Sequence, residues 1–340
     1  MYLNSVKLIN FRNHKKKTFT FSNKTLLTGN NGAGKTNVLE AIYLTLNPGK
    51  KSTPERNIMF ENKEAMAELE FSKNGSVVTA DIVFREDGKT YRENKKPANK
   101  KTIPLKTIYF RPEDSQIISG GPSKRRGFLD EISGQTDALY LNELYNYNRA
   151  LKQKNYLLRI SAPQQQIEPW NNKITELGAQ LYLKRERTTK ELLDKAKELF
   201  LELGEGEIET EYASQAEGKD PRGELENKIA QKTQEERERK NALVGIHLDE
   251  LKICVNKINI TSYGSHGQQR TAVFILRIAQ AKLLKERWKE NPLILLDDLK
   301  SELDSSHKEA VEKILNSKNQ IIATATDKCF NEKEFSCIEI

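Results

Sequence analysis

Apolar and polar residues alternate along the first quarter of the chain. The alternation covers residues 1–21 around a turn at 10–14, and it recurs at 65–71 and 77–84 on either side of Asn74-Gly75. Alternation with a period of two is typical of strands that bury one face, and Asn-Gly is a strong hairpin signal. We therefore expect an antiparallel β-layer in this part of the chain.

A helical period replaces the alternation in the middle of the chain. From about residue 130 to about residue 239, apolar residues, many of them leucine, recur at helical spacing among Lys, Arg, Glu and Gln. Breaks near 161–163, 204–206 and 220–223 divide this stretch. The pattern predicts an arm of antiparallel helices and is too imperfect for a long coiled coil.

The last part of the chain returns to strands. Residues 251–260 alternate, and residues 292–296 are a continuous apolar run. Such a run predicts a strand buried on both faces, as in a parallel sheet. We expect residues 320–327 to form a last buried strand and its exit. Amphipathic helices are expected at 273–284 and after Asp304.

A glycine-rich loop stands between a predicted strand at 25–28 and a predicted helix at 37–44. The loop fits G-x-x-x-x-G-K-[ST] with Gly29, Asn30, Asn31, Gly32, Ala33, Gly34, Lys35 and Thr36, and Asn37 follows it. Glycines let backbone N–H groups turn toward phosphate oxygens, the lysine reaches the β- and γ-phosphates, and the threonine ligates Mg²⁺. We name residues 29–36 the phosphate loop and assign ATP and Mg²⁺ as cofactors.

Two carboxylates follow the apolar run at 292–296. Asp297 is expected to hold Mg²⁺ together with Thr36, and Asp298 to polarise a water for attack on the γ-phosphate. Lys35 and Asp298 are thus the expected catalytic residues. Arg12, in the turn before the phosphate loop, either contacts the nucleotide or is a solvated turn arginine.

The composition narrows the class of protein. Lys and Arg total 56 against 48 Asp and Glu, and the net charge of +8 favours polyanion partners such as nucleic acid. Three cysteines without a C-x-x-C pair argue against a disulfide framework or a zinc site. The sequence has no apolar run that could span a membrane and no signal peptide, so we expect a cytoplasmic protein without a membrane partner.

The phosphate loop and Asp297 stand near opposite ends of the sequence, so the nucleotide fold is split by the helical arm. This arrangement, with Ser265-His266-Gly267-Gln268-Gln269 ahead of the Asp297 strand, resembles the ATP-binding-cassette heads of SMC-type chromosome proteins. Within that superfamily the chain is most similar to the RecF family of bacterial DNA repair proteins. The residues that carry the likeness are 10–13, the phosphate loop with 37–43, Phe110 with 112–114, 125–126 with 128–130, 263–265 with 267–271, and 295–298 with 301–304.

The resemblance implies a fold and an assembly. The fold is α/β, a split ATP-binding-cassette (P-loop NTPase) head at 1–120 plus 245–340, with an antiparallel β-layer and an inserted helical arm at 121–244. Two heads would dimerise around ATP, and each site would be completed in trans by Ser265, Gly267 and Gln268. Asp304 would lie at the dimer seam, and Thr326, or Thr324 if the alignment slips, would sense the γ-phosphate.

It also implies a function. The family's role is ATP-dependent DNA binding in recombinational gap repair, replication and the response to DNA damage, with a weak, DNA-dependent ATPase that resets the dimer. Partners would be gapped, single-stranded and double-stranded DNA, RecR, and also RecO and RecA. We expect DNA contacts near Lys95, Lys96, Arg125, Arg126, Lys184 and Arg185.

The sequence departs from the family pattern at several points. Leu248 stands where an arginine is usual, His266 replaces a common glutamine, and Lys300 is charged where the family is apolar or small. Residues 112–114 occupy the place of a water-positioning glutamine, for which Gln116 is a weak candidate. These changes indicate a divergent member.

Two other classes compete with this interpretation. A nuclease-associated ATPase of the overcoming-lysogenization-defect type has a similar split cassette, but we expect no nuclease module after Ile340 and find no separate acidic metal cluster. The nucleotide-binding half of a transporter would have a much shorter helical insertion.

Overall fold

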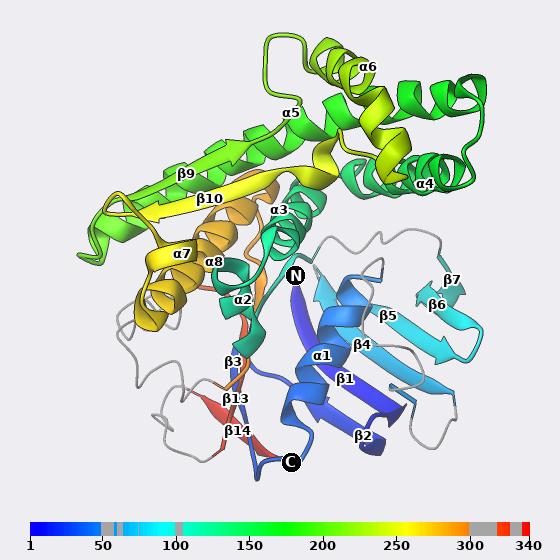
Figure 1. Cartoon of the computed structure of the whole chain (residues 1–340). Coiled ribbons are helices and arrows are strands. Elements are labelled where there is room, and N and C mark those ends of the chain that lie inside the picture. Colours follow the sequence, from blue (N-terminus) through cyan, green and yellow to red (C-terminus); the bar gives the residue numbers. More distant parts are fainter. Residues whose placement is uncertain (49–57, 60–63, 74, 99–104, 299–317, 327–334) are drawn as a thin grey trace. The chain divides into compact units, whose positions relative to one another are not determined.

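The computed structural model describes residues 1–48, 58–59, 64–73, 75–98, 105–298, 318–326 and 335–340 (Figure 1). These residues form two compact units, 1–114 with 284–340 and 115–283. The interruption of the first unit by the second agrees in kind with a split head. The exact division into a head at 1–120 plus 245–340 and an arm at 121–244 stays a prediction.

An antiparallel sheet forms one layer of the first unit, as the alternation predicts. Its order is β2-β1-β4-β5-β6-β7. The strands are β1 (Tyr2–Phe11), β2 (His14–Thr20), β4 (Ala65–Lys73), β5 (Ser76–Arg85), β6 (Gly88–Glu93) and β7 (Lys96–Pro97). In β4, every second side chain from Ala65 to Phe71 is buried while Glu68 and Glu70 between them are partly exposed. A period-two sequence therefore gives one buried face.

A parallel sheet forms the other layer. Its order is β14-β3-β13-β12-β8. The strands are β3 (Lys24–Thr28), β8 (Thr107–Phe110), β12 (Leu293–Leu296), β13 (Ile321–Ala325) and β14 (Ser336–Glu339). Every residue of β12 and β13 is buried, which confirms the prediction of a buried strand in each of these two segments. The edge strand β14, which pairs with β3, was not predicted.

Helix α1 (Lys35–Leu46) lies between the two sheets. It contacts β1, β4 and β5 of the antiparallel sheet and β8 and β13 of the parallel sheet. Eight of its residues are buried, from Val38 to Leu46. A helix that is apolar on most sides is a buried helix. The phosphate loop, which leads into α1, is therefore attached to a buried helix.

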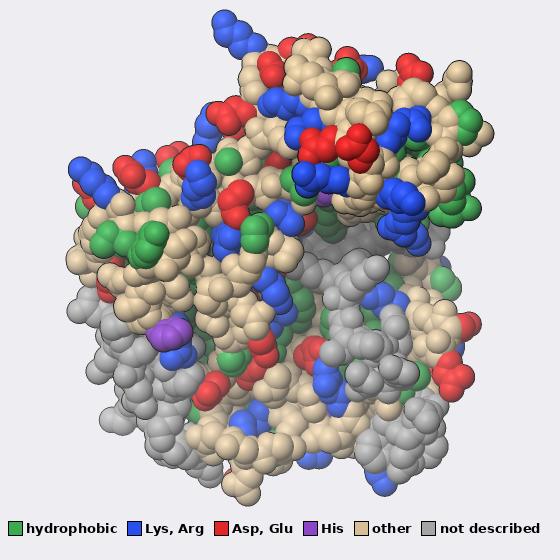
Figure 2. Space-filling view, in the orientation of Figure 1, with side chains coloured by type: hydrophobic (Ala, Val, Ile, Leu, Met, Phe, Trp, Pro, Cys, Tyr) green, Lys and Arg blue, Asp and Glu red, His purple; other side chains and the backbone are tan. Residues whose placement is uncertain are grey.

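The second unit is mainly helical. Its helices are α2 (Gln116–Ser119), α3 (Pro122–Thr136), α4 (Tyr140–Arg159), α5 (Gln164–Glu202), α6 (Pro221–Arg239), α7 (Ile260–Tyr263) and α8 (His266–Trp288), whose last turn falls in the first unit. Tyr140, Tyr147, Leu181 and Leu225 lie in the core that α4, α5 and α6 share. Charged side chains of both signs cover the exposed faces of these helices (Figure 2).

A three-stranded sheet, β11-β10-β9, packs beside these helices. Strand β10 (Glu250–Val255) pairs with β11 (Ile258–Asn259) and with β9 (Ile208–Ala213), which the helical pattern did not predict. No helix in the described ranges is long and apolar enough to cross a bilayer.

Candidate nucleotide-binding site

The phosphate loop turns sharply between β3 and α1. Gly29, Gly32 and Gly34 have backbone φ values of 150°, 84° and 104°, which residues with a side chain rarely adopt. A Cβ at Gly34 would also lie 2.5 Å from Asn13 Oδ1 and 2.6 Å from His14 Nε2. Position 34 therefore requires glycine both for its backbone angle and for the close approach of the β1–β2 turn.

Asn13 and His14, in that turn, support the phosphate loop from outside. The Asn13 amide donates to the carbonyl oxygens of Gly32 at 3.3 Å and Ala33 at 3.0 Å, and its Oδ1 accepts from Asn37 Nδ2 at 2.9 Å. His14 Nε2 lies 3.1 Å from the Gly34 carbonyl oxygen. Burial lowers the pKa of His14, so the neutral ring with a proton on Nε2 makes this bond.

Sequence reasoning missed these two supports. Residues 10–13 belong to the segments that carry the likeness to the family, but within them the sequence favours Arg12, the charged residue of the turn. Arg12 instead forms an ion pair with Glu40 of α1 at 2.5 Å and is not among the residues that line the pocket. Its contact with a nucleotide stays a prediction.

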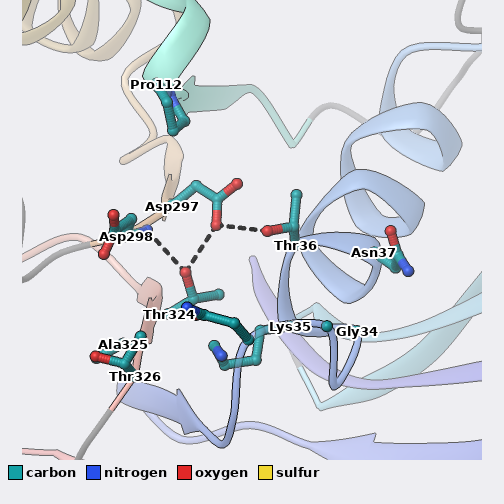
Figure 3. A pocket seen from close by; sticks show the side chains of 12 residues that line it. Gly34, Lys35, Thr36, Asn37, Pro112, Asp297, Asp298, Thr324, Ala325 and Thr326 are labelled. Carbon is teal, nitrogen blue, oxygen red and sulfur yellow. Dashed lines mark hydrogen bonds between the residues drawn. The ribbon is translucent and has the colours of Figure 1, made fainter.

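Lys35 folds back over the phosphate loop. Its Nζ donates to the carbonyl oxygens of Gly29 at 2.5 Å and Asn30 at 2.9 Å. The bonds keep the ammonium on the concave side of the loop, where Figure 3 shows its side chain directed toward the pocket. An anion held by the loop would meet this charge directly.

A carboxylate at the end of β12 faces Thr36 of α1. Asp297 Oδ1 accepts from Thr36 Oγ1 at 3.0 Å and from Thr324 Oγ1 at 2.7 Å (Figure 3), and Asp297 Oδ2 accepts from Tyr109 OH at 3.4 Å. Thr36 and Asp297 are 261 positions apart in the sequence. The hydroxyl and carboxylate oxygens are hard ligands of the kind that Mg²⁺ prefers, so this pair fits the ion.

The environment of Asp297 is poor in water. Burial raises the pKa of its carboxyl, and the negative charges of Glu113 and Asp298 act in the same direction. Hydrogen bonds from Thr324 and Thr36 oppose the increase. A cation placed beside Asp297 would relieve both the burial and the repulsion, which is the usual reason that such a carboxylate is a metal ligand.

Asp298 follows in a left-handed backbone conformation, with φ of 57°. Its backbone N–H donates to Thr324 Oγ1 at 2.8 Å, so one threonine of β13 holds both aspartates. Thr326, one residue past β13, also lines the pocket. Both threonines considered as phosphate sensors therefore reach the site, and Thr324 has the direct bond to Asp297.

These segments enclose one pocket of about 410 Å³. It is lined by Asn31, Gly32, Gly34, Lys35, Thr36, Asn37, Pro112, Asp297, Asp298, Thr324, Ala325 and Thr326. The pocket lies at the carboxyl ends of β3, β13 and β12, the edge at which open α/β sheets bind ligands. Gln116, the weak candidate for a water-positioning residue, is not among the lining residues.

Comparison with known proteins gives the family. A model described as an AAA ATPase domain matches residues 1–159. The DNA replication and repair protein RecF of Carboxydothermus hydrogenoformans is 34% identical over 96% of this chain and 95% of its own length. RecF of Clostridioides difficile is 30% identical over 100% of this chain and 96% of that protein. The chain belongs to the RecF family.

Solved structures agree with this assignment. A structure described as the recombination mediator protein RecF-ATP in the RecFOR pathway has a TM-score of 0.90 and 28% identity, and covers 100% of this chain and 95% of that one. An Smc head bound to the C-winged helix domain of ScpA has a TM-score of 0.55 and 16% identity, over 100% of this chain and 94% of that one. The second likeness shows the head fold alone.

The segment that is expected to act as the signature, residues 265–269, includes the first turn of α8, which begins at His266. Ser265 Oγ accepts from the Gln268 backbone N–H at 3.2 Å, while Gln268 Oε1 accepts from the Ser265 N–H at 3.0 Å. This reciprocal pair is a capping box. Residues 265–268 are exposed, so the remaining N–H groups of this helix terminus face outward. None of them lines the pocket of the first unit.

One of the departures expected from the sequence, Leu248, falls on a turn of the second unit. Tyr147 OH lies 2.8 Å from His247 Nδ1, and burial lowers the pKa of His247 to about 4. Asp249 pairs with Arg185 at 3.1 Å. Leu248, at the place of the usual arginine, is exposed. Lys300, Asp304 and the helix expected after them lie outside the described residues.

The expected DNA contacts at Arg125 and Arg185 are wrong. Both side chains are buried, Arg125 in an ion pair with Glu250 at 2.6 Å and Arg185 in one with Asp130 at 2.7 Å. A guanidinium that is buried and paired inside the fold is not available to a phosphate. Lys184 is also paired, with Glu143 at 2.6 Å.

Proposed function

We propose that this chain is an ATP-dependent DNA-binding protein of recombinational gap repair and replication, in which ATP closes two heads into a dimer on DNA. The observation that carries the proposal is the bond of 3.0 Å between Thr36 and Asp297 across a single pocket. It supports the proposal because it joins the two expected halves of a nucleotide site in a member of the RecF family, and a RecF relative of known structure is described as RecF-ATP.

ATP binding follows from the chemistry of the loop. Backbone N–H groups at the start of α1 and the Lys35 ammonium offer positive charge to the β- and γ-phosphates. Bound Mg²⁺ would supply further positive charge there, and Thr36 and Asp297 would hold it. When ATP binds, the Lys35 ammonium would leave the carbonyl oxygens of Gly29 and Asn30 and bind phosphate oxygens instead. ATP binding would therefore be coupled to the conformation of the loop.

Hydrolysis would be slow and would reset the dimer. Asp298 is assigned as the general base, because its backbone is fixed on Thr324 while its side chain lines the pocket. Thr326, or Thr324 in its place, is assigned to the sensing of the γ-phosphate, and both line the same pocket. A weak ATPase of this kind serves as a switch.

Dimerisation would complete the site. The Ser265 hydroxyl, the Gly267 N–H group and the Gln268 side chain are exposed at a helix N-terminus, where an anion is favoured. Placed by one copy against the γ-phosphate held by the other, they would close the pocket in trans. The proposed partners are gapped, single-stranded and double-stranded DNA and the proteins RecR, RecO and RecA. The proposed compartment is the cytoplasm.

The experiment that tests this function is a Ser265→Arg variant, sized with and without ATP. The wild type is expected to shift from monomer to dimer on addition of ATP and Mg²⁺. The variant is expected to stay monomeric because the arginine side chain blocks the approach of the second copy, while its Kd for ATP stays within about twofold of wild type. Sedimentation velocity and binding of a fluorescent ATP analogue measure the two quantities.

Two further variants separate the causes. Ser265→Ala removes the helix cap, at a cost of about 1 kcal/mol, and also removes the hydroxyl, but it adds no bulk, so it should dimerise more weakly than the wild type and more than Ser265→Arg. Gln234→Arg adds the same charge to the exposed face of α6 and should also dimerise. A Ser265→Arg protein that forms dimers with ATP would rule out completion of the site in trans.

A further inference from the structure

Five side chains form a stripe along the outside of α4. Tyr145, Arg149, Lys152, Tyr156 and Arg159 follow one another at spacings of four, three, four and three residues. This spacing places them on one face of an α-helix, and all five are exposed. We name these five residues the α4 stripe. Figure 2 shows Lys and Arg side chains over the region of this helix.

The positive charges of the α4 stripe are not neutralised within the described part of the chain. There, the stripe side chains have no ion pair or hydrogen-bond partner. Glu143 is the one acidic residue of α4, and Lys184 binds it at 2.6 Å. Lys154, the other cation of the helix, is buried against Glu236 of α6 at 2.7 Å. Among the described residues, the charged side chains of the α4 stripe are therefore all positive.

Helix α6 of the same unit shows the opposite arrangement. Its exposed cations are paired along the helix, Arg222 with Glu226 at 2.7 Å, Lys232 with Glu235 at 3.0 Å and Arg239 with Glu235 at 2.8 Å. Such pairs are the ordinary way in which a helix surface carries charge. The absence of acidic partners along the α4 stripe, within the described residues, thus distinguishes it from a neighbouring helix of similar length.

The two tyrosines decide which polyanion fits. As whole residues, Tyr145 and Tyr156 are 66% and 56% exposed, although burial of an aromatic side chain is strongly favourable. Exposed rings between cations suit a strand whose bases are unstacked, because the rings can stack on bases while the cations contact phosphates. A duplex offers phosphates, but its base faces are covered. At about 1.5 Å per residue the stripe is roughly 21 Å long, enough for several nucleotides.

We infer that the α4 stripe binds single-stranded DNA, with bases stacked on Tyr145 and Tyr156 and phosphates held by Arg149, Lys152 and Arg159. The inference rests on the proposed DNA-binding function for its ligand class and adds the strand type and the residues. None of these residues lines the nucleotide pocket, so the stripe is a separate surface for the partner.

The test uses the full chain and a labelled 30-nucleotide single strand in an anisotropy titration over a range of salt concentrations. Arg149→Gln/Lys152→Gln/Arg159→Gln should reduce the slope of log K against log salt by about 2, since each contact with a single strand contributes about 0.7. The matched control, Arg222→Gln/Lys232→Gln/Arg239→Gln, removes the same net charge from α6 and should leave the slope unchanged.

The tyrosines are tested separately from the charges. Tyr145→Ala/Tyr156→Ala should weaken single-strand binding by about tenfold per ring and leave the affinity for a duplex of equal length within about twofold. Tyr145→Phe/Tyr156→Phe keeps the rings and should bind as the wild type. The melting temperature and the Kd for ATP should stay unchanged in every variant, because the altered side chains are exposed and outside the pocket.

Three outcomes would overturn the inference. They are an unchanged slope in the α4 charge variant, an unchanged single-strand affinity in the alanine pair, and an equal loss for single strand and duplex in that pair. Each leaves the proposed function standing if the wild type still binds DNA in an ATP-dependent way. A wild type that binds no DNA in any nucleotide state would refute the proposed function as well.

Discussion

Lys35→Ala is expected to lower the affinity for ATP by about 100-fold and to abolish the ATP-dependent dimer. The ammonium makes two bonds to the loop carbonyls, and both would be exchanged for charge-assisted bonds to phosphate oxygens. A hydrogen bond to a charged group contributes about 1.5 kcal/mol or more, so the loss of two corresponds to about 3 kcal/mol. Isothermal titration with a slowly hydrolysed ATP analogue and Mg²⁺ measures the effect.

The matched control for this substitution is Lys73→Ala. Lys73 is an exposed lysine at the end of β4 in the same unit, and it does not line the pocket. Its removal lowers the net charge by the same amount and should leave the Kd for ATP unchanged. A similar loss in both variants would mean that overall charge, and not the Lys35 ammonium in the loop, determines ATP affinity.

Asp298→Asn is expected to slow ATP hydrolysis by about 100-fold or more while ATP binding and dimerisation persist. An amide is nearly isosteric with the carboxylate but cannot accept the proton of an attacking water, and a general base contributes about 10²–10⁴. The backbone bond to Thr324 does not involve the side chain, and asparagine tolerates the φ of 57°. ATP-bound dimers should therefore accumulate on DNA.

Single-turnover hydrolysis and the lifetime of the complex on DNA test this role together. Asp297→Asn is the informative comparison, because loss of that carboxylate should weaken binding of the Mg²⁺-nucleotide itself. Asp87→Asn, in the exposed turn between β5 and β6, should change neither quantity. Unchanged turnover in Asp298→Asn would remove Asp298 from the base role.

The elements that build the pocket could be predicted from sequence because each carries a local signal. The strand–loop–helix at residues 24–46 combines a glycine pattern with apolar runs on both sides, and β12 is a short apolar run that ends in two carboxylates. Strand β4 shows clean alternation. In each case the local sequence pattern is enough to predict the element, so no knowledge of distant contacts is needed.

Strand β9 and the supports of the phosphate loop could not be predicted in this way. Strand β9 is six residues long, follows a break after a helix of 39 residues, and depends on pairing with β10 some forty positions later. Asn13 and His14 bind the loop across about twenty positions. Nothing at these residues reveals the contact, because a turn with asparagine and histidine is ordinary in any exposed hairpin.

The two wrong DNA contacts have the same physical cause. Charge along a sequence does not show whether a guanidinium faces solvent or a buried carboxylate. The Arg125 side chain is hydrogen-bonded to Glu250, which is 125 positions away in the sequence, and the Arg185 side chain to Asp249, which is 64 positions away. The α4 stripe is the complementary case, since its spacing is visible in the sequence but its exposure and lack of described partners are visible only in the fold.

The central claim, that each ATP is held between two copies, is tested most directly by mixing Lys35→Ala with Ser265→Arg and measuring ATP hydrolysis. Neither variant alone should form a complete site. In a mixed dimer, the intact phosphate loop of the Ser265→Arg copy would meet the intact signature segment of the Lys35→Ala copy. The account predicts that hydrolysis in the mixture exceeds that of either variant alone, because a mixed dimer holds one complete site and only one of its two seams carries the arginine. A mixture as inactive as its two components would contradict it.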